Sequence, residues 1–236
     1  MNILVTGGTG FIGSHLTERL VSEGHHVRVL VSKNGRKIKR DAIRFLENLN
    51  VEIFNGNLLE KESLVGAMSG IEVVFHFAAI ARPSAIPEDF YFDVNEKGTR
   101  NLLSICDSPL IKKIIIMSSL AVFETCKNQE KLNEKSVCRP IDPYGASKLA
   151  QEKVAEYFIE KDRMPIVILR PSTVFGPRDM EILKLFKIIK NRFFPIRSNK
   201  KCINYLYIDN LVDASLLILE KGLVGEVYLV DNGDYC

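Results

Sequence analysis

The sequence lacks the cysteine pattern of a disulfide-bonded protein or of a zinc site. Its cysteines are odd in number, far apart, without a CxxC pair and without a histidine cluster to complete a metal site. They are Cys106, Cys126, Cys138, Cys202 and Cys236. We therefore expect reduced thiols in a cytosol and no bound metal ion.

Long hydrophobic runs and a strong net charge are absent as well. No run of about 18 apolar residues exists, and the apolar start of the chain breaks at Gly7, too early for a signal peptide. The 32 basic and 29 acidic side chains leave a formal net charge of only +3, and the basic residues are spread along the chain. These absences predict a soluble, cytoplasmic protein that binds neither a membrane nor nucleic acid.

Internal repeats and linkers rich in glycine, serine or proline are also missing. A chain of 236 residues, 46% hydrophobic and 26% charged, is instead typical of a folded globular protein with a large core. No domain boundary is visible before about Gly176-Pro177. We expect a dinucleotide-binding domain at 1–176, a partial substrate-binding lobe at 177–205, and a helix and strand at 206–236 that return to the first domain.

Short β-branched runs alternate with longer segments of helical periodicity. The expected strands are Ile3–Thr6, His26–Val31, Val51–Phe54, Val73–Phe77, Ile114–Ser118 and Ile166–Arg170. The helical stretches include Glu60–Met68, Phe90–Ser104 and Tyr144–Lys161. The strands are almost continuously apolar, as burial on both faces of a parallel sheet requires. The pattern predicts an α/β fold with a doubly wound parallel sheet of the Rossmann type.

A glycine cluster joins the first expected strand to the first expected helix. Glycines permit a tight turn and let backbone N–H groups approach a pyrophosphate, and the helix N-terminus adds partial positive charge. A purely structural turn is the alternative. The position of the cluster favours a dinucleotide site, whose residues are predicted to be Gly7, Gly10, Phe11, Ile12 and Gly13.

The end of the second expected strand bears on which dinucleotide binds. NAD sites usually carry an acidic residue about 20 positions after the glycine turn, to hold the ribose 2′-hydroxyl. Here Val31 is followed by Ser32 and Lys33, without a carboxylate. Ser32, Lys33 and Arg36 are suited to a 2′-phosphate, so the cofactor is NAD or NADP with the choice tilted toward NADP. Alternatively, this basic run is the solvated start of a surface helix.

Tyr144, Lys148 and Ser119 are the candidate catalytic residues. Tyr144 and Lys148 open a helix at four-residue spacing, which puts phenol and ammonium on one face. The ammonium favours a tyrosinate, which can take the proton of a carbinol as hydride leaves carbon. Lys148 can also donate to the nicotinamide ribose. Ser119 follows the strand Ile114–Ser118, where ligands bind in open parallel sheets, although serines there also serve as helix caps.

A second tyrosine and lysine pair occurs in the same expected helix. Tyr157 and Lys161 have the same spacing but lie more than three turns further on. The apolar neighbours of Tyr157 indicate packing rather than catalysis.

Ordered segments along nearly the whole chain resemble the extended short-chain dehydrogenase/reductase superfamily, in the branch called the NAD-dependent epimerase/dehydratase family. These segments are Thr6–Gly13, Gly56–Leu58, His76–Ala79, Val94–Thr99, Ser118–Phe123, Tyr144–Lys148, Arg170–Pro177 and Tyr207–Ala214. The resemblance implies that Ser119, Tyr144 and Lys148 are catalytic. It also implies cofactor contacts at Asn57, Leu58, Ala78, Ala79, Tyr144, Lys148, Pro171 and Ser172, with Asn95 as the structural asparagine of the cofactor site.

The sequence departs from the pattern of this family in three places. Asn57 replaces a usual aspartate, although its amide can still contact adenine, and Phe123 replaces a common tyrosine. The chain stops at Cys236, so the substrate lobe is either truncated or built from about Gly176 to Tyr205. The basic side chains there are suited to a diphosphate, and a solvated amphipathic helix is the alternative. They are Arg178, Lys184, Lys187, Lys190, Arg192 and Arg197.

Three functions remain open at this point. The resemblance implies an enzyme that oxidises and re-reduces a sugar carbon of a nucleoside-diphosphate sugar, as a homodimer formed through the helices Phe90–Ser104 and Tyr144–Lys161. The same residues would serve an NADP(H)-dependent dehydrogenase or reductase of a small or steroid-like alcohol or ketone. A non-catalytic nucleotide-sensing module is the third possibility, and the intact Ser119, Tyr144 and Lys148 set counts against it.

Overall fold

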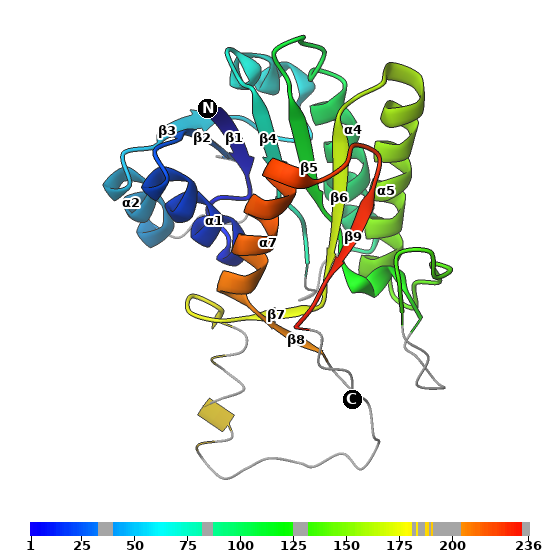
Figure 1. The fold of residues 1–236 in the computed structure, drawn as a ribbon. Helices are drawn as coiled ribbons and strands as arrows, with labels where there is room; N and C mark the ends of the chain where they lie inside the picture. Colours follow the sequence, from blue (N-terminus) through cyan, green and yellow to red (C-terminus); the bar gives the residue numbers. More distant parts are fainter. Residues whose placement is uncertain are drawn as a thin grey trace.

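A parallel β-sheet with helices on both faces forms the body of the protein in the computed structural model (Figure 1). The structure describes residues 1–32, 40–81, 87–124, 132–180, 183, 187, 188, 190 and 204–232. The strands of the sheet are β1 (Asn2–Thr6), β2 (His26–Val31), β3 (Glu52–Asn55), β4 (Val73–His76), β5 (Lys113–Met117), β6 (Ile166–Pro171) and β9 (Val227–Val230). Their order is β3-β2-β1-β4-β5-β6-β9, and all neighbours are parallel, which confirms the predicted Rossmann-type fold.

The helices follow the expected alternation with two local differences. The α-helices are α1 (Phe11–Ser22), α2 (Arg40–Asn48), α3 (Asp89–Phe92), α4 (Gly98–Leu103), α5 (Pro143–Asp162) and α7 (Ile208–Lys221). The segment predicted as one helix over Phe90–Ser104 contains a π-helical turn, η2 (Asp93–Lys97), between α3 and α4. The segment predicted over Glu60–Met68 is a 3₁₀-helix, η1 (Lys61–Met68).

Alternate side chains of β1 enter two different hydrophobic cores. Ile3 and Val5 pack with Leu16 of α1 on one face of the sheet. Leu4 packs with Leu102 of α4 on the other face. Because both faces are covered, every position of a central strand is buried, and this explains why the strands lack the alternation of a half-exposed sheet.

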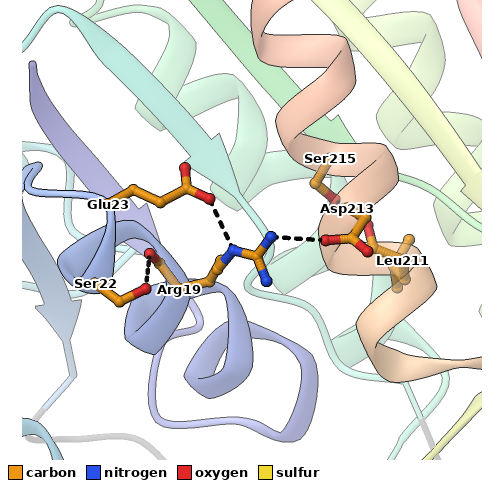
Figure 2. A network of polar contacts seen from close by, with 6 residues as sticks. All are labelled: Arg19, Ser22, Glu23, Leu211, Asp213 and Ser215. Atoms are coloured by element: carbon orange, nitrogen blue, oxygen red, sulfur yellow. Dashed lines mark hydrogen bonds and ion pairs between the residues drawn. The ribbon is translucent and has the colours of Figure 1, made fainter.

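The last described elements return to the sheet. Two short parallel strands, β7 (Thr173–Phe175) and β8 (Tyr205–Tyr207), lead into α7, and β9 then pairs with β6. Figure 2 shows one link between α1 and α7, in which Arg19 donates to Glu23 (2.7 Å) and to Asp213 (3.1 Å). The division into three domains stays a prediction, since most of residues 181–203 lie outside the described ranges.

No helix within the described ranges is long and apolar enough to cross a membrane. A half-buried charge holds the end of α7. The Lys113 ammonium donates to the carbonyl oxygens of Ile218 (3.0 Å), Leu219 (2.8 Å) and Gly222 (2.9 Å). The Ile218 carbonyl also accepts the N–H of Gly222 (2.9 Å), and Lys113 in β5 adds a charged donor to these carbonyls at the end of α7.

Replacing Lys113 by methionine should lower the free energy of unfolding by about 1–2 kcal/mol, because carbonyl groups at the end of α7 lose a charged donor. Urea unfolding would measure the change. Lys112→Met is the matched control, since the Lys112 side chain is 64% exposed and pairs with Glu72 on the surface. Equal losses in the two variants would contradict the capping role of Lys113.

Candidate active site

Helix α5 carries Tyr144 and Lys148 into the carboxyl edge of the sheet. Asp142 caps this helix by accepting the N–H of Gly145 (2.7 Å), and Pro143 occupies its first turn. Tyr144 is half-buried. Lys148, one turn later, is only 1% exposed, and its ammonium donates to the Met117 carbonyl (2.5 Å) at the end of β5.

A glycine allows α5 to approach the turn that carries Ser119. A Cβ atom at Gly145 would lie 2.1 Å from the Ala121 carbonyl oxygen. Ser119 precedes the 3₁₀ turn η3 (Leu120–Val122), and its hydroxyl accepts the N–H of Ala121 (3.1 Å). Ser119 and α5 are therefore held against the same short turn, as the prediction of a common site requires. The catalytic roles of these side chains stay predictions.

The electrostatics around Lys148 oppose its charge. Burial lowers the pKa of Lys148 to about 7, and the carboxylate of Glu152 acts in the opposite direction. The amine therefore changes its charge near neutral pH instead of staying an ammonium to about pH 10. Strongly shifted groups of this kind occur mainly where chemistry is done.

The fully buried His76 ring is neutral and its tautomer follows from its neighbours. The hydroxyl of Thr99 donates to the Asn95 carbonyl (2.6 Å) and accepts from the Gln151 amide (2.9 Å). Its only proton is thereby used, so Nε2 of His76 must donate to Thr99 (2.8 Å). Nδ1 of His76 then accepts from the Thr6 hydroxyl (2.8 Å). Burial and the nearby Lys148 lower the pKa of His76 to about 3.

This buried network connects the glycine turn to α4 and α5. Thr6 ends β1 just before the turn, and its hydroxyl also accepts the N–H of Ala78 (3.1 Å). Asn95, in the π-helical turn, accepts the N–H of Ile80 (2.8 Å) and donates to the Ile80 carbonyl (3.1 Å) and to Ser147 (2.9 Å). Both amide protons of Asn95 are used within the protein, as befits the structural role expected for it.

The turn between β1 and α1 has the shape and polarity of an anion site. Gly7 has φ +79°, and a Cβ there would lie 2.7 Å from the Ala78 nitrogen. A Cβ at Gly13 would lie 2.2 Å from the Gly7 carbonyl oxygen. Helix α1 begins after Gly10 without a side-chain cap and without an acidic residue in its first turn. Its N-terminal N–H groups and positive dipole are thus available to a phosphate, and the turn fits a pyrophosphate.

Two buried hydroxyls stand at the carboxyl ends of neighbouring strands. Ser118 follows β5 and Ser172 follows β6, and neither hydroxyl has a hydrogen-bond partner within the described ranges. A buried hydroxyl without a partner is costly, so these groups are suited to a polar ligand. Ser172 and the preceding Pro171 are predicted cofactor contacts, and the sequence places Ser118 beside Ser119 at a strand end suited to hydrogen bonding with a ligand, although only Ser119 is predicted to be catalytic. The chain thus fits a dinucleotide along this edge of the sheet.

A family model of known proteins matches residues 3–231, and its description is NAD dependent epimerase/dehydratase family. The chain belongs to this family. The resemblance inferred from the sequence motifs is therefore confirmed.

Two curated relatives show the range of the family. The chain is 31% identical over 259 residues to a dTDP-D-glucose 4,6-dehydratase of Dictyostelium discoideum, with 96% of this chain and 57% of the relative covered. It is 30% identical over 224 residues to a sterol-4-alpha-carboxylate 3-dehydrogenase (decarboxylating) of Homo sapiens, with 92% and 57% covered. The chain therefore spans less than two thirds of the length of these two relatives.

A solved structure agrees with the fold and carries ligands. The UDP-glucuronic acid 4-epimerase of Bacillus cereus, in complex with UDP-glucuronic acid and NAD, superposes with a TM-score of 0.85 and 29% identity. The match covers 99% of this chain and 78% of that chain. Related structures of the family thus bind NAD.

The other predicted cofactor contacts lie near the carboxyl edge of the sheet or among residues that the structure does not describe. Asn57 accepts the N–H of Leu59 (3.1 Å) and donates to Glu60 (2.9 Å), so its amide also holds the turn after β3. Leu58 is buried, Ala78 and Ala79 are half-buried after β4, and Ser32 is half-buried after β2. Lys33 and Arg36 lie outside the described residues.

The basic side chains from Arg178 to Arg197 are predicted either to hold a diphosphate or to lie on a solvated helix. Of these, Arg178 contacts other parts of the protein. Arg178 pairs with Glu18 of α1, donates to the hydroxyl of Ser14 (3.1 Å) and lies over the ring of Phe45 (4.6 Å). Its charge is therefore engaged with α1. Lys187 and Lys190 are exposed, whereas Lys184, Arg192 and Arg197 lie outside the described residues.

The second tyrosine and lysine pair is on the surface. Tyr157 is 45% exposed, and Lys161 donates to its hydroxyl (2.8 Å). Tyr157, which is predicted to pack, has its ring against that of Phe158 (5.4 Å between centroids), while Val154 and Phe158 occupy the buried face of α5. The geometry separates this pair from Lys148, which is buried.

The described ranges contain no group of three histidine, cysteine, aspartate or glutamate side chains that could hold a metal ion. Two of the five cysteines are described there. Cys106 is a buried free thiol and Cys138 a half-buried one.

Acid should destabilise the protein through His76. The unfolded ring takes up a proton near pH 6.5, whereas the folded ring stays neutral down to about pH 3. The stability that depends on the neutral ring is complete above pH 6.5 and is lost as the pH falls toward 3, at up to about 1.4 kcal/mol per pH unit. Guanidinium unfolding at several pH values would show this slope.

His76→Gln provides the comparison for this slope, because glutamine retains hydrogen-bonding groups but does not titrate. Its unfolding free energy should fall less steeply than that of the original protein over the same pH range. Parallel curves would contradict the assignment of acid lability to His76. His26→Gln, at an exposed position, should leave the slope in place.

Proposed function

We propose that the chain catalyses hydride transfer on a sugar carbon of a nucleoside-diphosphate sugar, with NAD or NADP as cofactor. The observation that carries the proposal is the buried amine of Lys148, one helical turn after Tyr144 and beside the strand end that leads to Ser119. Burying an amine costs free energy. A role in chemistry accounts for it.

The chain's own side chains divide the acid–base work. When bound, the nicotinamide cofactor supplies the hydride acceptor and donor. Ser119 orients the reacting oxygen of the substrate by a hydrogen bond, and Tyr144 takes the proton of the substrate hydroxyl as the carbon is oxidised. Lys148, when protonated, stabilises the phenolate of Tyr144. In the reverse direction Tyr144 returns the proton to the carbonyl oxygen.

In the proposed mechanism the phenolate of Tyr144 depends on the charge of Lys148. The charge of Lys148 is present below about pH 7 and lost above it, and the phenolate of Tyr144 is stabilised only while that charge is present. The activity of the pair should therefore depend on pH near neutrality. The proposed hydride transfer needs an anionic tyrosine. Its rate should therefore be sensitive to pH near the pKa of the Lys148 amine.

The relatives support the substrate class. The Dictyostelium relative is a dTDP-D-glucose 4,6-dehydratase, and the Bacillus structure holds UDP-glucuronic acid. The Homo sapiens relative favours a second candidate, a dehydrogenase or reductase of a steroid-like alcohol or ketone, which would use the same three residues. We also propose a homodimer, formed through α5 and through the segment that contains α3, η2 and α4.

Tyr144→Phe should lower turnover of a nucleoside-diphosphate sugar by about 100-fold or more, because the phenol is the proton acceptor. Binding of NAD or NADP, followed by fluorescence titration, should be retained. Tyr157→Phe is the matched control on the same helix and should change neither quantity. Full turnover in Tyr144→Phe would overturn the assignment.

We also propose that NADP is preferred over NAD. Val31 ends β2, and the half-buried Ser32 follows it where a carboxylate would favour NAD. Lys33 and Arg36, next in the sequence, supply positive charge for a 2′-phosphate.

Lys33→Glu should weaken NADP binding by about tenfold or more while NAD binding changes little, since only NADP carries the extra phosphate. Calorimetric titration of both cofactors against both proteins gives the four affinities needed. If the substitution weakens both cofactors equally, the 2′-phosphate argument fails.

A further inference from the structure

An ion pair is buried one helical turn beyond Lys148. Arg170 in β6 donates through Nε and Nη2 to the two carboxylate oxygens of Glu152 in α5, at 2.9 and 2.6 Å. The side chains are 6% and 1% exposed. Neither the predicted catalytic set nor the predicted cofactor set contains these residues.

Arg170 is fixed on its other sides as well. Its guanidinium lies 5.0 Å from the centre of the Phe123 ring, and its Nη1 donates to the Glu134 carbonyl (3.4 Å). The Glu134 side chain in turn accepts the N–H of Leu229 in β9 (3.2 Å). The guanidinium is therefore held in one orientation, in which its fork faces the carboxylate of Glu152.

Lys148 and Glu152 are natural partners for each other. They are four residues apart on α5, and both are buried on the same side of the helix. Yet the ammonium of Lys148 donates to the Met117 carbonyl, while both oxygens of Glu152 are bound by Arg170. The arginine thus occupies the carboxylate that would otherwise bind the lysine.

We propose that Arg170, acting through Glu152, is a positioning residue of the active site that keeps the amine of Lys148 directed to the end of β5 and available to Tyr144. The inference rests on the proposed function for its catalytic meaning. The competition of two cations for one buried carboxylate does not depend on cofactor or substrate and can be tested in the protein alone.

Other charged and titratable groups face these three residues. His76 of β4 and Tyr144 of α5 are near Lys148, and His76 is neutral. Glu156 of α5 and Cys138, in the segment before α5, are near the ion pair. Burial and the Glu152 charge raise the pKa of Glu156, whereas the Arg170 charge acts in the opposite direction.

The competition predicts opposite effects of two neutral substitutions. Arg170→Gln can still donate to Glu152 but removes the competing positive charge, so Lys148 should hold its proton to a higher pH. Glu152→Gln can still accept from Arg170 but removes the attracting charge, so Lys148 should lose its proton at a lower pH. A charge at this distance typically changes a titration midpoint by about one unit or more.

Carbon NMR of protein labelled with ¹³C-lysine measures the titration of Lys148 directly in the full chain without cofactor. Lys148→Met identifies the resonance. The expected order of midpoints is Arg170→Gln above the original protein and Glu152→Gln below it, with the double variant above Glu152→Gln. Glu160→Gln, an exposed charge on the same helix, is the matched control and should leave the midpoint unchanged.

Unchanged midpoints in both single variants, or shifts in the same direction, would overturn the proposal, because they would show that the charges of Arg170 and Glu152 do not act against each other at the amine of Lys148. Circular dichroism establishes folding. If Arg170→Gln does not fold, Glu152→Gln and the double variant decide. The proposal is overturned if Lys148 has the same midpoint in Glu152→Gln as in the original protein. It is also overturned if the midpoint in the double variant is not above that in Glu152→Gln.

The result is separable from the proposed function. The expected midpoints in a protein that turns over no nucleotide sugar would support the positioning of Lys148 and contradict the proposed reaction. Turnover with midpoints that do not move would do the reverse. Where turnover is measurable, the pH profile of kcat should shift in the same direction as the midpoint of each variant.

Discussion

The burial of the Lys148 amine is the constraint on which the site depends. An amine without water around it must be given a partner, and the carbonyl at the end of β5 provides one. That contact requires α5 to lie close to the strand end, which the missing side chain of Gly145 permits. Burial also brings the proton affinity of the amine near neutrality, where a small change in its surroundings alters its charge.

A second set of buried contacts connects the two halves of the site. The neutral His76 ring joins Thr6, at the entrance to the glycine turn, to Thr99, which is also bonded to Gln151 of α5. The element that fits a pyrophosphate and the helix that carries Tyr144 are thereby fixed relative to each other. Buried hydrogen bonds between elements fix how these elements lie against each other, as transfer between a cofactor and a substrate demands.

Much of the fold could be predicted from the sequence, because apolar runs and helical periodicity are local signals. The glycine turn and the spacing of Tyr144 and Lys148 are local as well. The Glu152 and Arg170 pair could not be predicted, since it depends on how α5 lies against β6. The pairing of Arg178 could not be predicted for a similar reason: its acidic partner lies in α1, far away in the sequence. Side chains that select the substrate depend on the same kind of tertiary arrangement.

A crystal structure of the protein with NADP or NAD is the most direct test of where the cofactor binds. The pyrophosphate should lie at the turn from Gly7 to Gly13, and the nicotinamide ring should lie beside the hydroxyl of Tyr144. An empty glycine turn, or a nicotinamide ring remote from Tyr144, would contradict this prediction.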